Sequence, residues 1–263
     1  MIKIAIDAMG GDFAPEQQVK GAIEALGKSG DFSVILAGDE AALKAELSKY
    51  KYDSSRVEIV HAPEVITNDD VPTKAVKTKK NSSTVVAFEL LKEGRADALV
   101  SSGATGAVLT AAVLVLGRIK GISRPALCPR IPNLKGTGTL LCDCGANLDC
   151  KPVNLAHFAI MATAYAQAAY GMKNPKVGLL SNGTEDHKGD ALHQAANELL
   201  KGMSCIDYAG NVEGRDIMAG DIDIAVADNY SESREEREPQ SEAHHAIRIG
   251  KAQNNKRDAE GIE

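Results

Sequence analysis

The sequence of 263 residues contains no tryptophan, and aromatic residues make up only 4% of it. So few rings argue against a stacking platform for single-stranded nucleic acid. An excess of positive charge is also absent, because the formal net charge is −6 at pH 7. We therefore expect no broad binding to a phosphate backbone and no nucleic-acid partner. A small anionic substrate remains compatible with this charge, since local backbone dipoles can oppose it.

No apolar run is long enough to span a bilayer, since the longest, near residues 107–117, is interrupted by Thr110. The chain opens as a strand, without the charged and apolar regions of a signal peptide. The five cysteines are an odd number, which does not suit a complete disulfide framework. These absences together favour a protein of the reducing cytoplasm.

Three of the cysteines, Cys142, Cys144 and Cys150, are close enough in sequence to raise the question of a metal site. Their spacing is not a recognised zinc pattern, and neither a histidine nor a fourth cysteine follows closely. Small buried side chains on a strand and its turn are the simpler interpretation. We expect neither a metal nor a cofactor.

Short β-branched runs alternate with amphipathic segments along most of the chain. We expect strands at residues 2–6, 33–37, 57–61, 98–100, 140–143, 177–180 and 223–227, with the strand at 98–100 buried. Helices are expected to begin at Pro15, Asp39, Ser83, Thr105, Pro152 and Gly189. The helix from Pro152 is expected to bury one face made of Leu155, Phe158, Ala159, Ala162 and Tyr165. Strands that alternate with helices predict the α/β class, with a mostly parallel sheet covered on both sides.

The character of the chain changes after Asp228. Residues 229–263 are charged and polar, with almost no large aliphatic side chains that could pack against a sheet. We therefore predict an α/β domain over residues 1–228 and a polar tail over residues 229–263 that is disordered or loosely helical.

Polar, glycine-rich segments follow many of the predicted strands, at the edge where open α/β sheets bind ligands. They cover residues 7–12, 101–107, 143–147, 181–189 and 210–216, and residues 81–83 add a loop before a helix. Glycine lets a backbone approach an oxyanion closely, and helix N-termini at Thr84 and Thr105 present free N–H groups. These features predict anion binding. The alternative is that glycine only satisfies turn geometry, while serine and threonine only cap helices.

Several common catalytic motifs are absent. The sequence has no G-x-x-x-x-G-K-[ST] loop, no G-x-G-x-x-G in its first βα turn and no G-x-S-x-G elbow. A P-loop nucleotidase, a dinucleotide-binding enzyme and a serine hydrolase are therefore not favoured. Four histidines, His61, His157, His187 and His193, have no obvious serine or cysteine partner.

The remaining motifs are specific when they are taken together. In order along the chain they are IAIDAMGGD, KKNSS, VSSGATGAVLTA, GRIKGISRPAL, DCGANLDCKP, GLLSNGTEDHKGD and GNVEGRD. In this order, over residues 1 to about 228, they resemble the phosphate acyltransferase family of phospholipid synthesis. The resemblance implies a three-layer α/β/α Rossmann-like fold, related to isocitrate and isopropylmalate dehydrogenases and to phosphotransacetylases.

The resemblance also implies a reaction and its partners. Acyl–acyl carrier protein and inorganic phosphate would give acyl phosphate and free carrier protein, as the first step toward phosphatidic acid. Members of this family look like homodimers, with the active cleft near the subunit interface. A cytoplasmic location, with peripheral association at the inner face of the membrane, is compatible with the resemblance.

The implied reaction needs no acyl-enzyme, because phosphate is itself a nucleophile. It needs donors that hold phosphate and the developing thioester oxyanion at attacking distance. We expect Lys188 and His187 to supply positive charge, and Asn147 and Asn182 to act as neutral donors. Candidate phosphate- and substrate-binding residues are Asp7, Gly10, Gly11, Asp12, Asn81, Ser82, Ser83, Ser102, Gly103, Thr105, Gly106, Asp143, Gly145, Gly183, Glu185 and Asn211. Asp7 and Asp12 would repel phosphate at close range, so we interpret them as loop-orienting groups or as contacts to a metal.

Two departures from the family leave other interpretations open. Family members commonly carry asparagine or serine where this chain has Ala104, and they continue after the last strand with a glycine-rich turn and a helical region. Here Asp228 is followed by Asn229 and Tyr230, so we expect that helical region to be missing through a frameshift, a truncation or real divergence. The alternatives are an inactive truncated remnant, a module that binds carrier protein, a short-chain phosphate acyltransferase using coenzyme A, and a metal-dependent hydroxyacid dehydrogenase.

Overall fold

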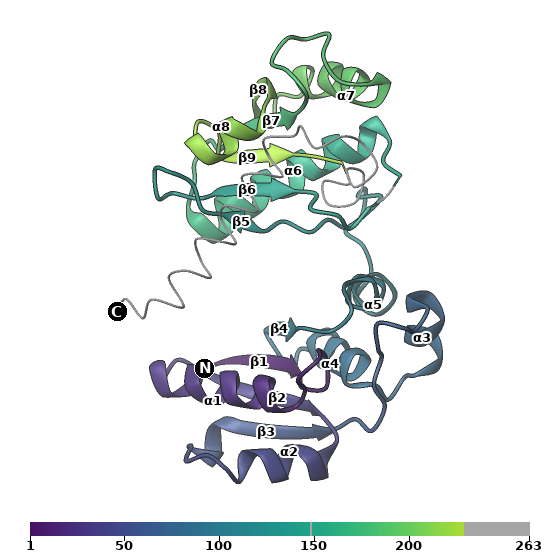
Figure 1. Ribbon diagram of the computed structural model, residues 1–263, viewed down its shortest axis with the longest axis vertical. Coiled ribbons are helices and arrows are strands. Elements are labelled where there is room, and N and C mark those ends of the chain that lie inside the picture. Colours follow the sequence, from purple (N-terminus) through teal and green to yellow (C-terminus); the bar gives the residue numbers. More distant parts are fainter. Residues whose placement is uncertain (148, 229–263) are drawn as a thin grey trace. The chain divides into compact units, whose positions relative to one another are not determined.

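The computed structural model describes residues 1–147 and 149–228. The chain divides into two compact units, Met1–Lys120 and Gly121–Glu263 (Figure 1). Each unit has its own sheet and its own hydrophobic core. The predicted polar tail, residues 229–263, lies outside the described residues, and a single domain over residues 1–228 stays a prediction.

The first unit is built on a parallel sheet of four strands in the order β3–β2–β1–β4. The strands are β1 (Ile2–Asp7), β2 (Phe32–Gly38), β3 (Val57–His61) and β4 (Ala98–Ser101). The helices are α1 (Glu16–Lys28), α2 (Glu40–Leu47), α3 (Pro72–Thr78), α4 (Ser83–Lys92) and α5 (Thr105–Ala111). A 3-10 turn, η1 (Ser54–Arg56), and a π-helical turn, η2 (Ala112–Leu116), complete the unit.

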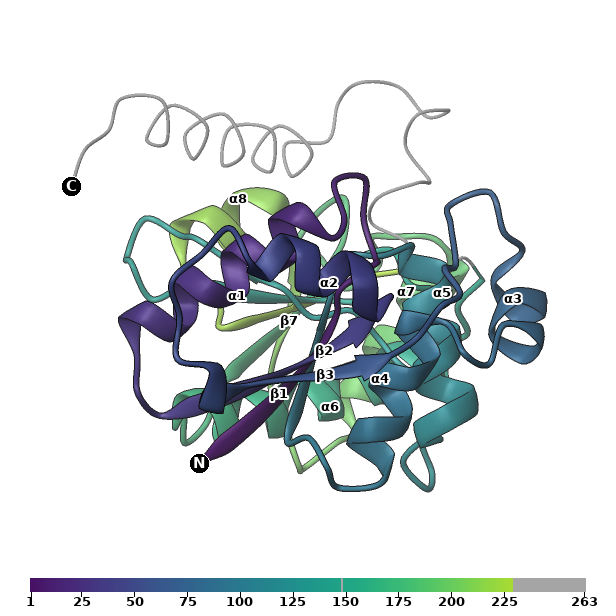
Figure 2. The same ribbon diagram turned by 90° about the horizontal axis from the view of Figure 1, so that it is seen from below.

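Alternation along the strands divides this core between the two faces of the sheet. Ile6 and Val34 pack with the side chains of α1 and α2. Their neighbours Ala5 and Ile35 pack with α4. Successive side chains of a strand point to opposite faces, so helices are needed on both sides. Figure 2 shows this arrangement, with α1 and α2 on one side of β1–β3 and α4 on the other.

The second unit contains a five-stranded sheet in the order β5–β6–β9–β7–β8. Its strands are β5 (Arg130–Ile131), β6 (Thr139–Cys142), β7 (Lys176–Leu180), β8 (Asp207–Val212) and β9 (Ile224–Val226). Its helices are α6 (Pro152–Tyr170), α7 (Ala191–Lys201) and α8 (Gly214–Ala219). Only β5 is antiparallel to its neighbour.

Helices cover both faces of this second sheet as well (Figure 1). Leu140 and Val177 pack with α6 and α7 on one face. Leu141 and Ala225 pack with Ile217 of α8 on the other. The predicted α/β class, with mostly parallel strands between helical layers, is therefore confirmed, although the strands are divided between two sheets.

Some sequence-based predictions of local structure are wrong. The strand at residues 98–100 is not buried, because β4 forms the edge of its sheet and Val100 is 54% exposed. Tyr165 is 44% exposed, because the buried stripe of α6 continues from Ala162 to Ala166, four residues on. Helix α4, in contrast, begins at Ser83 as predicted, and Ser82 caps it, since its hydroxyl accepts from Val85 N at 3.4 Å.

Four short elements had no clear sequence signal, namely α3, β5, β8 and α8. The segment predicted as a turn at residues 210–216 instead completes β8 and begins α8 at Gly214. Its glycines suggested a turn, whereas pairing with β7 extends the strand, which illustrates how tertiary context overrides local propensity. Among the described residues, no helix combines the length and apolar character needed to cross a membrane.

The core of α6 gives a direct test of this packing. Phe158 is fully buried, whereas Tyr165 on the same helix makes an exposed edge-to-face contact with Tyr170 at 5.7 Å. We predict that Phe158→Ala lowers the free energy of unfolding by about 3–5 kcal/mol. Tyr165→Ala should lower it by no more than about 1.5 kcal/mol. Urea unfolding followed by circular dichroism measures both, and equal losses would contradict the assigned burial.

Candidate functional site

A buried carboxylate organises the strand ends of the first unit. Asp7, the last residue of β1, is fully buried, and its Oδ2 accepts hydrogen bonds from Thr84 Oγ1 and Ser101 Oγ, each at 2.8 Å. These donors come from α4 and from the end of β4, so one carboxylate oxygen joins three elements. The prediction that Asp7 orients loops agrees with this geometry. Asp7 Oδ1 is buried without a hydrogen-bond partner in the described part of the chain.

The two glycine turns beside Asp7 pack closely against each other. A Cβ at Gly10 would lie 2.6 Å from Asp7 Oδ2 and 2.9 Å from the backbone nitrogen of Gly103. The neighbouring Gly11 has a φ of 108°, a conformation that side chains disfavour. Glycine is therefore required here because two backbone segments meet over a carboxylate.

Side chains on the outer side of these turns form a second layer of hydrogen bonds. Gln18 Nε2 of α1 donates to Gly10 O at 2.6 Å and to Ser102 Oγ at 2.9 Å. Ser102 Oγ donates in turn to Gly10 O at 2.9 Å. The sequence did not single out Gln18, because a polar residue at the start of an amphipathic helix is ordinarily solvated.

The N-terminus of α4 offers fewer free donors than predicted. Ser83 N already donates to Glu64 O at 3.1 Å, and Val85 N to the Ser82 hydroxyl. Asn81 N donates to Glu64 Oε2 at 2.9 Å. Ser83 Oγ is buried without a hydrogen-bond partner within the described residues. The hydroxyl of Ser83 thus remains a candidate for ligand binding, while the backbone around it is largely committed.

The other predicted residues of this unit lie at the surface of the same strand ends. Thr105 and Gly106 are exposed at the start of α5, whose first N–H groups carry no side-chain cap. Asp12 is exposed in the turn after β1. The first unit therefore brings together Asp7, Gly10, Gly11, Ser102 and Gly103, with α4 and α5 beginning beside them.

In the second unit, Asp143 plays a role like that of Asp7. It follows β6, is fully buried, and accepts from the backbone N–H groups of Leu127, Ala146 and Asn147 at 2.8–3.0 Å. The Asn147 amide nitrogen also donates to Asp143 Oδ2 and to Pro125 O. Both amide hydrogens of Asn147 are thus committed within the loop around Gly145. This geometry favours positioning rather than substrate binding for Asn147.

The loop between β7 and α7 carries the predicted cation. Asn182 Oδ1 accepts from Gly189 N at 2.9 Å, which closes the loop. A Cβ on the buried Gly183 would meet Lys188 Cγ and Glu185 Oε2, each at 2.9 Å, so the stem of Lys188 lies directly over Gly183. Lys188 Nζ makes no ion pair within the described residues. An unpaired ammonium on a closed loop is suited to meeting a substrate anion.

Asn211 supports this loop from the neighbouring strand β8. It is buried, and its Nδ2 donates to Glu185 O at 2.8 Å. Its Oδ1 has no hydrogen-bond partner in the described chain. His187 is exposed in the same loop, where its carbonyl accepts from Gln194 Nε2 at 2.8 Å. Asn182, Gly183, Glu185, His187, Lys188 and Asn211 are therefore brought together.

His193 is a residue of this region that the sequence interpretation set aside. Its side chain is only 16% exposed and contacts two carboxylates, Asp190 at 2.8 Å and Asp228 at 3.2 Å. Burial alone would lower its pKa, but hydrogen bonds to the two carboxylates outweigh burial and raise the pKa of His193 above its ordinary value. Asp190 caps α7 and Asp228 follows β9, so the imidazolium links the β7–α7 loop to the end of β9. From sequence, only the contact between His193 and Asp190 could have been predicted, because these two residues are three positions apart.

His157 has a serine partner, contrary to the interpretation from sequence. Ser123 Oγ lies 3.1 Å from His157 Nδ1 and accepts from Asn154 Nδ2 at 2.6 Å. The three residues fasten the segment before β5 to the first turns of α6. The partner is 34 residues away in sequence, which is why no local pattern indicated it.

The cysteines behave mainly as small apolar side chains. Cys142 is buried in the core beneath α6, and Cys144 and Cys150 pack at the margins of the two cores of the unit. In the described residues, no group of three or more histidine, cysteine or acidic side chains is arranged to hold a metal ion.

Comparison with known proteins identifies the family. The model of the family described as "Fatty acid synthesis protein" matches residues 2–232. A phosphate acyltransferase of Fusobacterium nucleatum is 51% identical over 230 residues, covering 88% of this chain and 69% of that protein. The chain belongs to the phosphate acyltransferase family. A phosphate acyltransferase of Clostridioides difficile is 46% identical, covering 88% of this chain and 67% of that protein. Phosphate acyltransferases are acyl-transferring enzymes, so the recognition from sequence motifs is confirmed.

Solved structures support the same fold at greater distance. A phosphotransacetylase from Streptococcus pyogenes aligns with a TM-score of 0.62 at 19% identity, covering 87% of this chain and 78% of that chain. A 4-hydroxythreonine-4-phosphate dehydrogenase from Klebsiella pneumoniae aligns with a TM-score of 0.56 at 11% identity, covering 94% and 84%. These likenesses confirm the Rossmann-like fold class expected for phosphate acyltransferases.

The glycine turn at Asp7 provides one test. We predict that Gly10→Ala lowers the free energy of unfolding by about 1–3 kcal/mol, because the new methyl group must displace the carboxylate or the facing backbone. Gly27 is the matched control, since a Cβ added there on α1 would meet nothing within 4 Å. Gly27→Ala should stabilise the protein by up to about 1 kcal/mol. Chemical denaturation of both variants measures the difference, and a neutral Gly10→Ala would contradict the close approach.

The pKa of His193 provides a second test. Because its folded-state pKa is raised, the contribution of His193 to stability is fully present below its unfolded pKa, about 6.5. That contribution is lost as pH rises through the higher folded pKa. The gap in unfolding free energy between the parent chain and His193→Gln should therefore narrow as pH is raised from about 6. Asp228→Asn should reduce the same pH dependence, and a gap that widens with pH would contradict the assigned ion pairs.

Proposed function

We propose that this chain transfers a fatty acyl group from acyl carrier protein to inorganic phosphate, as the first step toward phosphatidic acid. A phosphate oxygen attacks the thioester carbonyl carbon and forms the new C–O bond. The tetrahedral oxyanion then collapses, the C–S bond breaks, and the thiolate leaves and takes up a proton. The products are acyl phosphate and the free thiol of the carrier protein.

The observation that carries this proposal is the identity of 46–51% with proteins named phosphate acyltransferase, over 87–88% of the chain. The description of the family as a fatty acid synthesis protein supports a fatty acyl donor. The chain spans 66–72% of the length of these relatives, so the activity of the whole protein is part of the proposal.

The described residues supply the kind of groups that this chemistry needs. The glycine turns at Gly10 and Gly103 present backbone at the edge of the first sheet, with the Ser102 hydroxyl beside them. We assign phosphate binding to the end of the Gly103 turn, where Thr105 and Gly106 are exposed and the first N–H groups of α5 carry no side-chain cap, because free backbone N–H groups and hydroxyls suit an oxyanion. We assign stabilisation of developing negative charge to Lys188 and Asn182, whose loop is closed before any substrate arrives.

The partners are part of the same proposal. The thioester donor is acyl carrier protein and the acceptor is inorganic phosphate. A homodimer, a cytoplasmic location and peripheral association with the inner face of the membrane complete it, and each stays a prediction.

The experiment that tests the function measures release of the carrier-protein thiol from acyl–acyl carrier protein, with and without phosphate. We expect release that depends on phosphate and incorporation of labelled phosphate into an acid-labile acyl phosphate. Faster thiol release from acyl–coenzyme A than from acyl–acyl carrier protein would show that coenzyme A, not the carrier protein, carries the acyl donor. If the chain bound the carrier protein without turnover, it would be a binding module and not an active acyltransferase.

Lys188 gives the sharpest prediction about this reaction. We expect Lys188→Ala to reduce turnover by about 10²–10³-fold, the effect of removing one preorganised group that stabilises the transition state. Unfolding free energy should change little, because Lys188 makes no ion pair within the described residues. Lys188→Arg should restore part of the rate if charge is what matters. Lys176→Ala is the control, since this exposed lysine starts β7, the strand that leads into the loop of Lys188. Unchanged turnover in Lys188→Ala would show that the lysine is only solvated.

A further inference from the structure

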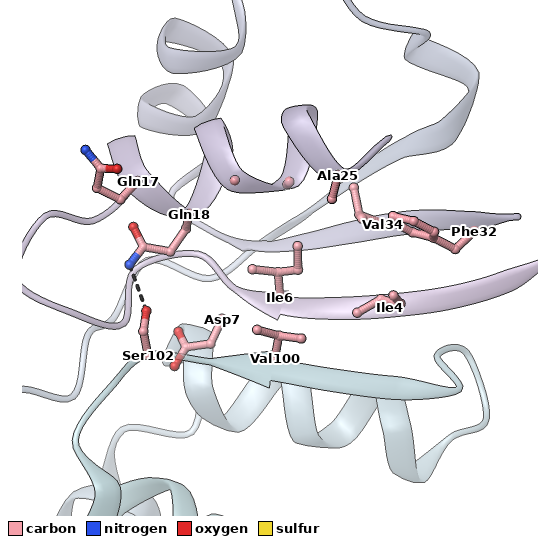
Figure 3. A pocket seen from close by; sticks show the side chains of 12 residues that line it. Ile4, Ile6, Asp7, Gln17, Gln18, Ala25, Phe32, Val34, Val100 and Ser102 are labelled. Atoms are coloured by element: carbon pink, nitrogen blue, oxygen red, sulfur yellow. Dashed lines mark hydrogen bonds between the residues drawn. The ribbon is translucent and has the colours of Figure 1, made fainter. Parts of the chain in front are cut away.

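An apolar groove of about 350 Å³ lies in the first unit, between α1 and the sheet (Figure 3). Strands β1, β2 and β4 form its floor, and its apolar lining includes Ile4, Ile6, Ala25, Phe32, Val34 and Val100. This volume falls within the roughly 300–1,000 Å³ range of small-molecule sites. The groove borders the core, since Ile6 and Val34 of its lining pack in the core, but it opens to solvent at Val100, which is 54% exposed.

The polar groups of the groove are gathered at one end. Gln18 and Ser102 are joined there by their hydrogen bond of 2.9 Å, next to Asp7. Figure 3 shows these three side chains at one end and Phe32 with Ile4 at the other. Ser102 also belongs to the Gly103 turn, at whose end phosphate binding is assigned. The groove therefore leads from the proposed phosphate site along an apolar floor.

We propose that this groove holds the alkyl chain of the fatty acyl group, with the carbonyl end at Ser102 and Gln18 and the chain directed toward Phe32. The proposal rests on the proposed function and locates the acyl part of its substrate. A long alkyl chain must leave water somewhere on the enzyme, and each methylene buried in an apolar groove strengthens binding by about fourfold. A peptide segment would need partners for its backbone N–H and C=O groups, which the apolar side chains of the lining do not offer away from the edge of β4, whereas an alkyl chain has none to satisfy along the whole groove.

Two glycines of α1 make the proposal testable without disturbing the core. Gly21 lines the groove, and a Cβ added there would meet no atom within 4 Å. Gly27 lies on the same helix with the same open surroundings but does not line the groove. Leucine is tolerated in helices better than glycine, so both Gly21→Leu and Gly27→Leu should fold. Only Gly21→Leu adds bulk at the groove.

The experiment compares binding of palmitate and octanoate to the full chain by titration calorimetry, below the concentrations at which micelles form. We expect the parent chain and Gly27→Leu to bind palmitate at least about tenfold more tightly than octanoate. Gly21→Leu should lose most of that preference. In the acyl-transfer assay, Gly21→Leu should lower the rate with long-chain acyl donors while the rate with short-chain donors persists.

The outcomes separate this proposal from the proposed function. Binding that depends on Gly21 in a chain without transfer activity would support the groove and reject the activity. Transfer activity whose chain-length preference is the same in Gly21→Leu and Gly27→Leu would support the activity and overturn the groove. Absence of palmitate binding would overturn the groove as well. The proposal would also be overturned if Gly21→Leu had a lower melting temperature than Gly27→Leu while fatty-acid binding stayed intact. That result would show that a segment of polypeptide, rather than an alkyl chain, covers the groove.

Discussion

Each unit of the protein depends on one buried carboxylate at the end of a strand. Asp7 and Asp143 are both fully buried, and burying a carboxyl group is costly unless hydrogen bonds replace those it made with water. Hydroxyls of Thr84 and Ser101 serve Asp7, whereas backbone N–H groups serve Asp143. Because the donors come from other loops, satisfying each carboxylate fixes the loops around it. The loops at this edge of each sheet are thus shaped by the need to supply one buried carboxyl group with hydrogen-bond donors.

The two carboxylates differ in how completely they are satisfied. Both oxygens of Asp143 accept hydrogen bonds, so that loop is closed upon itself. Only Oδ2 of Asp7 accepts, and Oδ1 is left without a partner among the described residues. A buried acceptor without a donor is uncommon in folded proteins and is more often found where a ligand or water binds. This asymmetry leaves Asp7 able to accept one more hydrogen bond, from a water or a ligand hydroxyl rather than from phosphate, and it favours a supporting role for Asp143.

Sequence patterns predicted the class of fold well, because the signals for it are repeated along the chain. Alternation along β1 and β2 and the apolar stripe of α6 each depend on many residues, so single errors such as Tyr165 matter little. The strand-end glycines were also predictable, since Gly10 and Gly11 have geometric roles that other residues cannot fill. Contacts between distant residues were not predictable. Ser102 meets Gln18 across 84 residues and Thr84 meets Asp7 across 77, and no local period encodes such pairs.

The difference between local patterns and distant contacts also explains why some candidate residues have another role in the structure than the one predicted from sequence. The sequence predicts Asn147 as a neutral donor and Ser82 as a binding residue, but in the structure the amide of Asn147 donates to Asp143 and the hydroxyl of Ser82 caps a helix. A hydrogen-bonding group that already has a good partner gains little from a ligand, because binding must first break that bond. Within the described residues, the groups still able to gain a partner include Lys188 Nζ, the Ser83 hydroxyl and the exposed start of α5. The proposed chemistry therefore falls on the few side chains that still have unmet hydrogen-bonding capacity, not on every residue of the family motifs.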